Sequence, residues 1–167
     1  PVLGGISHLK EIDLKKIYLV AAAGRSVWRR SMVQRAKKYG AQFTNIIHPT
    51  AIISRWTEIG EGAIIQSHCM IQPDCKIGNF FTCNGTVRIG HDTLIGDFVH
   101  INPTVNIAGG TFIGDDVFIG VKATVLKSQI GNGSIIGACA LITKDVPENV
   151  VAKGIPAKYD ELYDKKY

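Results

Sequence analysis

The sequence is poor in aromatic residues and charges, and it has no long apolar run. Only 8% of its 167 residues are Phe, Trp or Tyr, and 20% are charged. No stretch approaches the roughly 18 consecutive apolar residues of a membrane-spanning helix, and the first residues lack the order of a signal peptide. The hydrophobic content of 46% excludes a disordered chain. We therefore expect a soluble, cytoplasmic protein of one or two domains.

Cysteine spacing and charge narrow the possible partners. Cys69, Cys75, Cys83 and Cys139 form no C-x2-C pair, and an intracellular chain keeps such thiols reduced, so neither a zinc site nor a disulfide is expected. The net charge of +5 favours anionic partners without naming them. The basic residues between Arg25 and Lys38 lack the regular interleaving of aromatic rings that base stacking requires, which argues against nucleic acid.

A period of six residues runs through most of the chain. Ile or a similar side chain recurs at every sixth position, one residue drops out after Val125, and the series then resumes. Its members are Ile47, Ile53, Ile59, Ile65, Ile71, Ile77, Cys83, Ile89, Ile95, Ile101, Ile107, Ile113, Ile119, Val125, Ile130, Ile136 and Ile142. Gly or Asn often follows, as in Gly60, Gly78, Asn84, Gly90 and Gly96.

An α-helix cannot hold this stripe on one face, because six residues at about 3.6 per turn do not complete whole turns. Short strands separated by bends fit the pattern. Three such segments close a triangular coil of about 18 residues, stacked on the next at about 4.8 Å. A prism filled with Ile has little room for rings, so we expect most of the later phenylalanines on outer faces or at subunit contacts. These are Phe80, Phe81, Phe98, Phe112 and Phe118.

The first 45 residues have a different pattern. Residues 17–22 are typical of a buried parallel strand, and residues 27–39 of an amphipathic helix ended by Gly40. The turn between them, with Gly24 and Arg29, is either an anion site at a helix N-terminus or an ordinary turn beside a solvated basic helix. Residues 42–46 are expected to form a last short strand that leads into the coils.

One histidine stands out among five. His91 is followed directly by Asp92, a carboxylate that can hold an imidazole tautomer and raise its basicity. Gly109 lies one 18-residue coil later, so its N–H could meet an oxyanion beside His91. Asn84, Asn102 and His100 belong to other sides of the triangle, so a site that uses both groups should form between two subunits. His8, His48 and His68 are expected to be structural or solvated.

Residues 46–157 resemble the hexapeptide-repeat acyltransferases with a left-handed parallel β-helix. Residues 84–92 and 95–101 resemble the catalytic stretch of that family. The resemblance implies His91 as general base, Asp92 as the residue that enhances it, and the Gly109 backbone as oxyanion donor. It also implies substrate or coenzyme contacts at Asn84 and His100, coenzyme A contacts at Val121 and Ala138, and a homotrimer with sites between neighbouring prisms. Gly90 departs from the acidic residue often found there.

The N-terminal part is similar to acetyltransferases that modify nucleotide-linked amino sugars, and to sialic acid O-acetyltransferases. The resemblance implies a mainly β protein with a partial Rossmann-like, nucleotide-sugar-binding α/β domain (1–45), a left-handed β-helix (46–147) and a C-terminal tail (148–167). Gly24 and Arg29 would contact the acceptor. A Gly-rich phosphate-binding turn is absent and the chain begins at Pro1. Either about 50 preceding residues are missing, which the resemblance favours, or the protein binds its nucleotide differently.

The expected reaction moves an acetyl group from acetyl-CoA to the amino group of such a sugar, without a metal. Basic residues such as Lys122, Lys144, Lys153 or Lys158 would lie near the coenzyme phosphates. Three alternatives stay open: a sugar O-acetyltransferase, a non-catalytic trimeric scaffold that binds nucleotide sugars, and a zinc hydratase on the same prism. The hydratase is disfavoured, because His68, His91 and His100 do not reproduce its histidine spacing.

Overall fold

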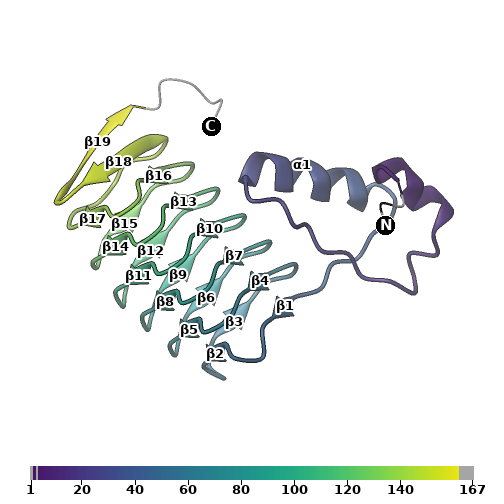
Figure 1. The fold of residues 1–167 in the computed structure, drawn as a ribbon, viewed down its shortest axis with the longest axis horizontal. Coiled ribbons are helices and arrows are strands. Elements are labelled where there is room, and N and C mark those ends of the chain that lie inside the picture. Colours follow the sequence, from purple (N-terminus) through teal and green to yellow (C-terminus); the bar gives the residue numbers. More distant parts are fainter. Residues whose placement is uncertain (1, 3, 162–167) are drawn as a thin grey trace.

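Two-residue strands repeat along the chain from residue 46. The computed structural model describes residue 2 and residues 4–161, and each strand from β1 to β17 spans two residues. The second residue of every one of these strands is a member of the six-residue series, and almost all of them point into the core. Because the chain bends after each pair, no strand grows longer. The period predicted from the sequence is therefore confirmed (Figure 1).

The strands form three sheets that run along the stack, and all strands are parallel except β19. The eight-stranded sheet contains, in spatial order, β1 (Ile46–Ile47), β4 (Ile64–Ile65), β7 (Thr82–Cys83), β10 (His100–Ile101), β13 (Phe118–Ile119), β16 (Ile135–Ile136), β18 (Val150–Gly154) and β19 (Ala157–Glu161). The six-stranded sheet contains β17 (Leu141–Ile142), β14 (Thr124–Val125), β11 (Asn106–Ile107), β8 (Arg88–Ile89), β5 (Met70–Ile71) and β2 (Ile52–Ile53). The five-stranded sheet contains β15 (Gln129–Ile130), β12 (Phe112–Ile113), β9 (Leu94–Ile95), β6 (Lys76–Ile77) and β3 (Glu58–Ile59).

Register between coils follows the 18-residue repeat. Cys83 pairs with Ile101, and Ile101 pairs with Ile119, so identical positions of successive coils lie above one another. Phe112 pairs with Gln129, 17 residues later, where the sequence drops one residue. Backbone hydrogen bonds between neighbouring coils satisfy the strand N–H and C=O groups. A residue's place in the repeat therefore fixes which residues are its neighbours.

Three turns join the sheets at the corners of the triangle. The helix corner comprises 60–62, 78–80, 96–98, 114–116 and 131–133; the Asn84 corner comprises 48–50, 66–68, 84–86, 102–104, 120–122 and 137–139; and the His91 corner comprises 54–56, 72–74, 90–92 and 108–110. The third residue of most turns has a positive φ, for example 54° at Asp92 and 58° at Phe98. This left-handed conformation bends the chain sharply within three residues.

The core is a column of aliphatic side chains with few rings, as expected. Phe81 is an exception, because it is fully buried inside the prism rather than on an outer face. Phe80 and Phe98 point outward but are buried, since they stack on each other and pack with Phe43 beneath the N-terminal segment. Phe112 is exposed, in agreement with the expectation.

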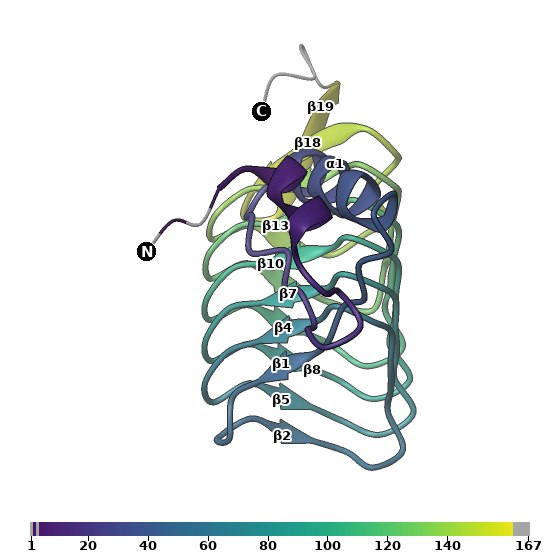
Figure 2. The same cartoon turned by 90° about the vertical axis from the view of Figure 1, so that its right-hand side faces the viewer.

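The N-terminal segment folds against the helix corner. It contains a 3-10 helix, η1 (Ile6–Glu11), and the expected helix, α1 (Ser26–Lys37). Arg30 near the start of α1 pairs with Asp116, and Lys37 at its end pairs with Glu61, so α1 runs along this corner. Figures 1 and 2 show the segment beside one edge of the stack.

The buried strand expected at residues 17–22 is wrong. A single parallel bridge joins Leu19 to Phe43, and Tyr18 and Val20 are exposed. Residues 18, 20 and 22 are exposed whereas 17, 19 and 21 are partly or fully buried, so the protein covers only one face of this segment. Within the described residues, the first 45 form no sheet beyond this bridge, so the Rossmann-like domain stays a prediction.

The C-terminal end continues the eight-stranded sheet past residue 147, where the tail was expected to begin. β18 pairs with β16 in parallel, and β19 folds back onto β18 as an antiparallel strand. Residues 162–167 of the predicted tail lie outside the described residues, as do Pro1 and Leu3. Among the described helices, none has the length and apolar character needed to cross a membrane.

We expect Ile119→Ala to destabilise the prism strongly, because Ile119 has 0% exposure and lies between two coils. Large-to-small substitutions at such sites cost about 2–5 kcal/mol of unfolding free energy. Ile52→Ala is the matched control, since Ile52 is 64% exposed and should change stability by about 0.5 kcal/mol or less. Urea unfolding followed by circular dichroism measures both, and equal losses would contradict this packing.

Candidate active site

His91 and Asp92 form an exposed pair at the His91 corner. The Nδ1 atom of His91 lies 2.6 Å from Oδ2 of Asp92, and the side chains are 63% and 66% exposed. A carboxylate accepts a hydrogen bond, so a neutral imidazole in this pair carries its proton on Nδ1. Nε2 then keeps its lone pair and faces away from Asp92. The pair is thus arranged to accept a proton at Nε2.

Gly109 lies directly against the His91 ring. The carbonyl of His91 accepts a 2.8 Å hydrogen bond from the N–H of Gly110, which fixes the two coils in register. A methyl group placed on Gly109 would lie 2.8 Å from Nε2 of His91, closer than real contacts allow. Among the described residues, the N–H of Gly109 donates to no acceptor. A small residue with a free donor therefore lies beside the potential base.

Gln72 supports His91 and was missed in the sequence. Its Oε1 accepts a 3.0 Å hydrogen bond from the backbone N–H of His91. Gln72 precedes His91 by one coil and one residue, so the repeat could have identified it. This contact anchors the backbone from which the imidazole projects.

A second group of predicted residues lies at the Asn84 corner and the adjoining eight-stranded sheet. Nδ2 of Asn84 lies 3.4 Å from Nε2 of His100 in β10. Phe118, one coil later, stacks on the His100 ring with centroids 5.4 Å apart and planes 12° apart. His100 is 7% exposed. The two groups project from different corners, as expected from the repeat.

Burial keeps His100 uncharged. Loss of solvent and then the nearby Arg29 cation lower the pKa of His100 to about 4. Its Nδ1 atom is buried and has no hydrogen-bond partner among the described residues. His100 therefore cannot serve as the cation of an ion pair near neutral pH, and it acts as a neutral hydrogen-bonding group.

Val121 and Ala138 also lie at the Asn84 corner, in later coils. The N–H of Cys139 donates to the carbonyl of Val121 at 2.9 Å, which stacks the two turns. Both Val121 and Ala138 are exposed. The structure thus places Asn84, Val121 and Ala138 on one line along the prism, with His100 beside it. The three residues at the His91 corner, His91, Asp92 and Gly109, face another direction.

The anion-binding role expected of Arg29 is wrong. Its side chain is 1% exposed, and its guanidinium donates to backbone carbonyls only. The acceptors are Phe80 (3.1 Å), Ala23 (2.7 Å), Gly24 (3.1 Å), Phe98 (2.6 Å) and Val99 (3.4 Å). Burial lowers the pKa of Arg29 to about 10, so it remains charged, and no N–H is left to bind an anion. Gly24 does lie close to a predicted site residue, since a methyl group there would be 3.7 Å from Cε1 of His100.

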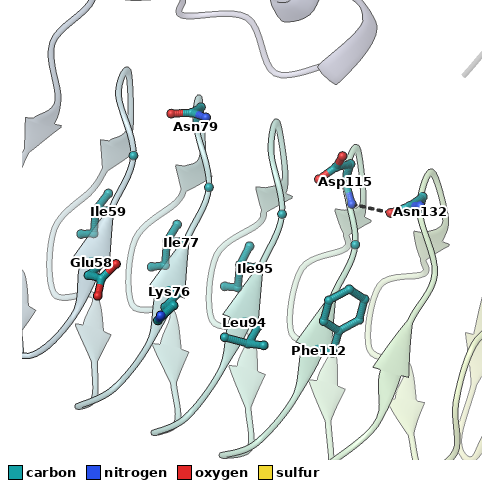
Figure 3. Close-up of a pocket in the computed structure, with 14 residues that line it drawn as sticks. Glu58, Ile59, Lys76, Ile77, Asn79, Leu94, Ile95, Phe112, Asp115 and Asn132 are labelled. Carbon is teal, nitrogen blue, oxygen red and sulfur yellow. Dashed lines mark hydrogen bonds between the residues drawn. The ribbon is translucent and has the colours of Figure 1, made fainter.

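A hollow of about 640 Å³ lies on the outer face of the five-stranded sheet (Figure 3). Leu94 and Phe112 lie side by side in it, and Lys76 and Glu58 continue the row toward the first coil. Along its edge, side chains of the helix corner accept hydrogen bonds from the preceding coil, as Asn132 does from the N–H of Asp115 at 2.8 Å. None of the predicted site residues lines this hollow.

The pKa of His100 predicts a pH dependence of stability. The folded pKa of about 4 lies below the unfolded value near 6.5, so the unfolded chain binds the additional proton and the unfolding free energy falls as pH decreases through this window. Between pH 7 and pH 4.5 the wild type should lose about 2–3 kcal/mol more than His100→Asn. Urea unfolding at both pH values measures this, and identical losses in the two proteins would refute it.

The chain is similar to known acetyltransferases in both sequence and structure. No protein-family model matches the chain. A GDP-perosamine N-acetyltransferase of Escherichia coli O157:H7 is 34% identical over 91 residues, which cover 54% of this chain and 41% of that protein. The chain thus matches less than half the length of this curated relative.

Solved structures match over almost the whole chain. The perosamine N-acetyltransferase of Caulobacter crescentus, in complex with CoA and GDP-perosamine, is 31% identical with a TM-score of 0.92, covering 96% of this chain and 78% of that one. Two further structures of that enzyme carry one histidine replaced by Asn or Ala, and both hold CoA and GDP-perosamine.

A second solved structure is also similar to almost the whole chain. The acetyltransferase domain of PglB from Neisseria gonorrhoeae, in complex with acetyl coenzyme A, is 30% identical with a TM-score of 0.91, covering 95% of this chain and 78% of that one. These likenesses establish the left-handed parallel β-helix. The chain belongs to the hexapeptide-repeat acetyltransferases of the nucleotide-sugar N-acetyltransferase family.

Proposed function

We propose that the protein transfers an acetyl group from acetyl-CoA to the amino group of a nucleotide-linked amino sugar. The observation that carries this proposal is the His91 ring held by Asp92 directly against Gly109, whose N–H is free among the described residues. The relatives that bind CoA, acetyl-CoA and GDP-perosamine support the choice of substrates. GDP-perosamine is therefore the first acceptor to assay, and a cytoplasmic location belongs to the same proposal.

The geometry supports direct transfer. The amine lone pair attacks the thioester carbonyl carbon and forms the N–C bond, while Nε2 of His91 accepts the amine proton. The carbonyl electron pair moves to oxygen, where the Gly109 N–H stabilises it. The oxyanion then collapses, the C–S bond breaks, and the CoA thiolate takes the proton from the His91 imidazolium. Asp92 stabilises that imidazolium while it exists.

Two subunits would complete each site in a homotrimer. His91 and Gly109 lie at one corner of the prism, and Asn84, Val121 and Ala138 lie at another, with the six-stranded sheet between them. A groove between neighbouring prisms would bring the His91 corner of one to the Asn84 corner of the next. Leu94 and Phe112 support association as well, because their 44% and 45% exposure leaves an apolar strip on the five-stranded sheet.

His91→Ala should reduce the rate of thiol release by about 100-fold or more, because the general base is removed. Acetyl-CoA affinity, measured by isothermal titration calorimetry, should stay near the wild-type value. His48→Ala is the matched control, since His48 lies in the first coil and bonds locally to Thr50. Full activity of His91→Ala would remove His91 from the mechanism.

Subunit mixing tests the shared site. His91→Ala and the double variant Asn84→Ala/His100→Asn disable different corners, and each alone should be nearly inactive. Co-expressed and purified as mixed trimers, they should recover about one quarter of wild-type activity, because random assortment leaves that share of interfaces with two intact halves. Sites contained within one chain would give no recovery. Light scattering should show trimers in all three preparations.

The chemical group that becomes acetylated distinguishes the proposed N-acetyltransferase from an O-acetyltransferase and from a non-catalytic scaffold. Mass spectrometry of reactions with UDP-, GDP- and dTDP-linked 3-amino and 4-amino sugars detects an acetyl gain on the amine. Acetylation of a hydroxyl would favour the O-acetyltransferase. Binding of a nucleotide sugar without thiol release, by a protein that contains any preceding segment, would favour the scaffold.

A further inference from the structure

The turn one coil after Gly109 is one residue shorter than the other turns of the His91 corner. Three residues, 126–128, join β14 to β15, whereas four residues, 108–111, join β11 to β12. In a full-length turn the third residue donates its N–H to the preceding coil, as Gly110 does to the carbonyl of His91 at 2.8 Å. The short turn makes no such bond, so the carbonyl of Gly109 accepts none from any residue that the structure describes. The Gly109–Gly110 turn therefore lacks a contact that closes the other turns.

Lys127, in the short turn, lies over Gly110. Its Cε and Nζ atoms are 3.3 Å and 3.8 Å from the position of a methyl group added to Gly110. Gly110 has a φ of 68°, but residues with side chains adopt this conformation at equivalent positions, for example Asp92 at 54°. The missing side chain of Gly110 thus leaves room that the lysine chain occupies. The ammonium group is thereby placed beside the turn that carries the free N–H of Gly109.

Lys127 has no counterion in the part of the chain that the structure describes. It is exposed and makes neither an ion pair nor a hydrogen bond there. The nearest carboxylates along this corner have other partners: Oδ2 of Asp92 lies 2.6 Å from Nδ1 of His91. Oδ1 of Asp145, one coil later, accepts a 2.8 Å hydrogen bond from the N–H of Gln129. A cation without a counterion keeps its attraction for negative charge that forms nearby.

We propose that Lys127 is a catalytic residue whose ammonium group stabilises the negative charge of the transfer reaction. The inference rests on the proposed function. In that reaction the carbonyl electron pair moves to the thioester oxygen beside Gly109, and the charge passes to the CoA sulfur when the C–S bond breaks. Lys127 donates an N–H to that oxygen next to the bond from Gly109, and then attracts the sulfur as charge reaches it. The lysine keeps all its protons and forms no covalent bond, so His91 remains the only base.

A lysine at this position has one plain alternative role, which is to bind a phosphate group of the coenzyme. The phosphates of CoA and its thiol lie at opposite ends of the pantetheine chain. A phosphate beside Gly110 would therefore take the thioester away from Gly109. Acetyl-pantetheine distinguishes the two roles, because it contains the thioester and none of the phosphates.

Lys127→Met tests the proposal, since it removes the charge and keeps a long, flexible side chain. We expect the single-turnover rate of thiol release from acetyl-CoA, with GDP-perosamine as acceptor, to fall about tenfold, which corresponds to about 1.4 kcal/mol. KM for acetyl-CoA should stay near the wild-type value, because the interaction forms only in the transition state. Lys127→Arg should restore most of the rate. Lys38→Met is the matched control and should equal the wild type, since Lys38 is an exposed lysine at the end of α1.

The phosphate-free donor completes the test. With acetyl-pantetheine, Lys127→Met should again lower kcat/KM about tenfold. A loss with acetyl-CoA that disappears with acetyl-pantetheine would assign Lys127 to the phosphates and overturn the proposal. Wild-type rates of Lys127→Met with both donors would overturn it as well and leave the proposed function intact. Absence of thiol release by the wild type, with every nucleotide-linked amino sugar assayed, would refute the proposed function and with it this role of Lys127.

Discussion

The whole molecule depends on the in-register parallel stacking of coils about 18 residues long. Each two-residue strand within the stack bonds to the strand one coil above and one coil below, and this pairing fixes the neighbours of the turn residues. The inward aliphatic column supplies the apolar burial that holds the stack together. Because the register is fixed, chemistry follows from sequence spacing: Gly109 lies beside His91, and Phe118 stacks on His100, in each case one coil later.

The repeat made much of this structure predictable. The period of six predicted the strands, and the 18-residue spacing predicted the contact between His91 and Gly109. The residue dropped after Val125 accounts for the 17-residue step from Phe112 to Gln129. The contact of Gln72 with His91 and the stacking of Phe118 on His100 were missed, although the repeat brings both pairs together. Gln72 belongs to no recognised motif, and Phe118 carries no polar group. The position of Phe81 was missed, since a period of six does not decide which ring fits inside.

The N-terminal segment was predicted less well, and Arg29 shows why. Residues 1–45 have no repeat, so their partners depend on tertiary contacts that spacing does not encode. The sequence showed a basic residue after a glycine turn, which fits an anion site and a buried anchor equally. Only the five carbonyls around the guanidinium decide between them. Likewise, residues 17–22 have the composition of a buried strand but only one bridging neighbour.

The central claim is that two corners of the repeat, one from each of two prisms, form an acetyl-transfer site. A crystal structure of the protein with CoA tests it most directly. We predict that the CoA sulfur lies beside His91 and Gly109 of one subunit, and that the coenzyme runs along Val121 and Ala138 of the neighbouring subunit. CoA bound wholly on one prism, or away from the His91 corner, would contradict the account.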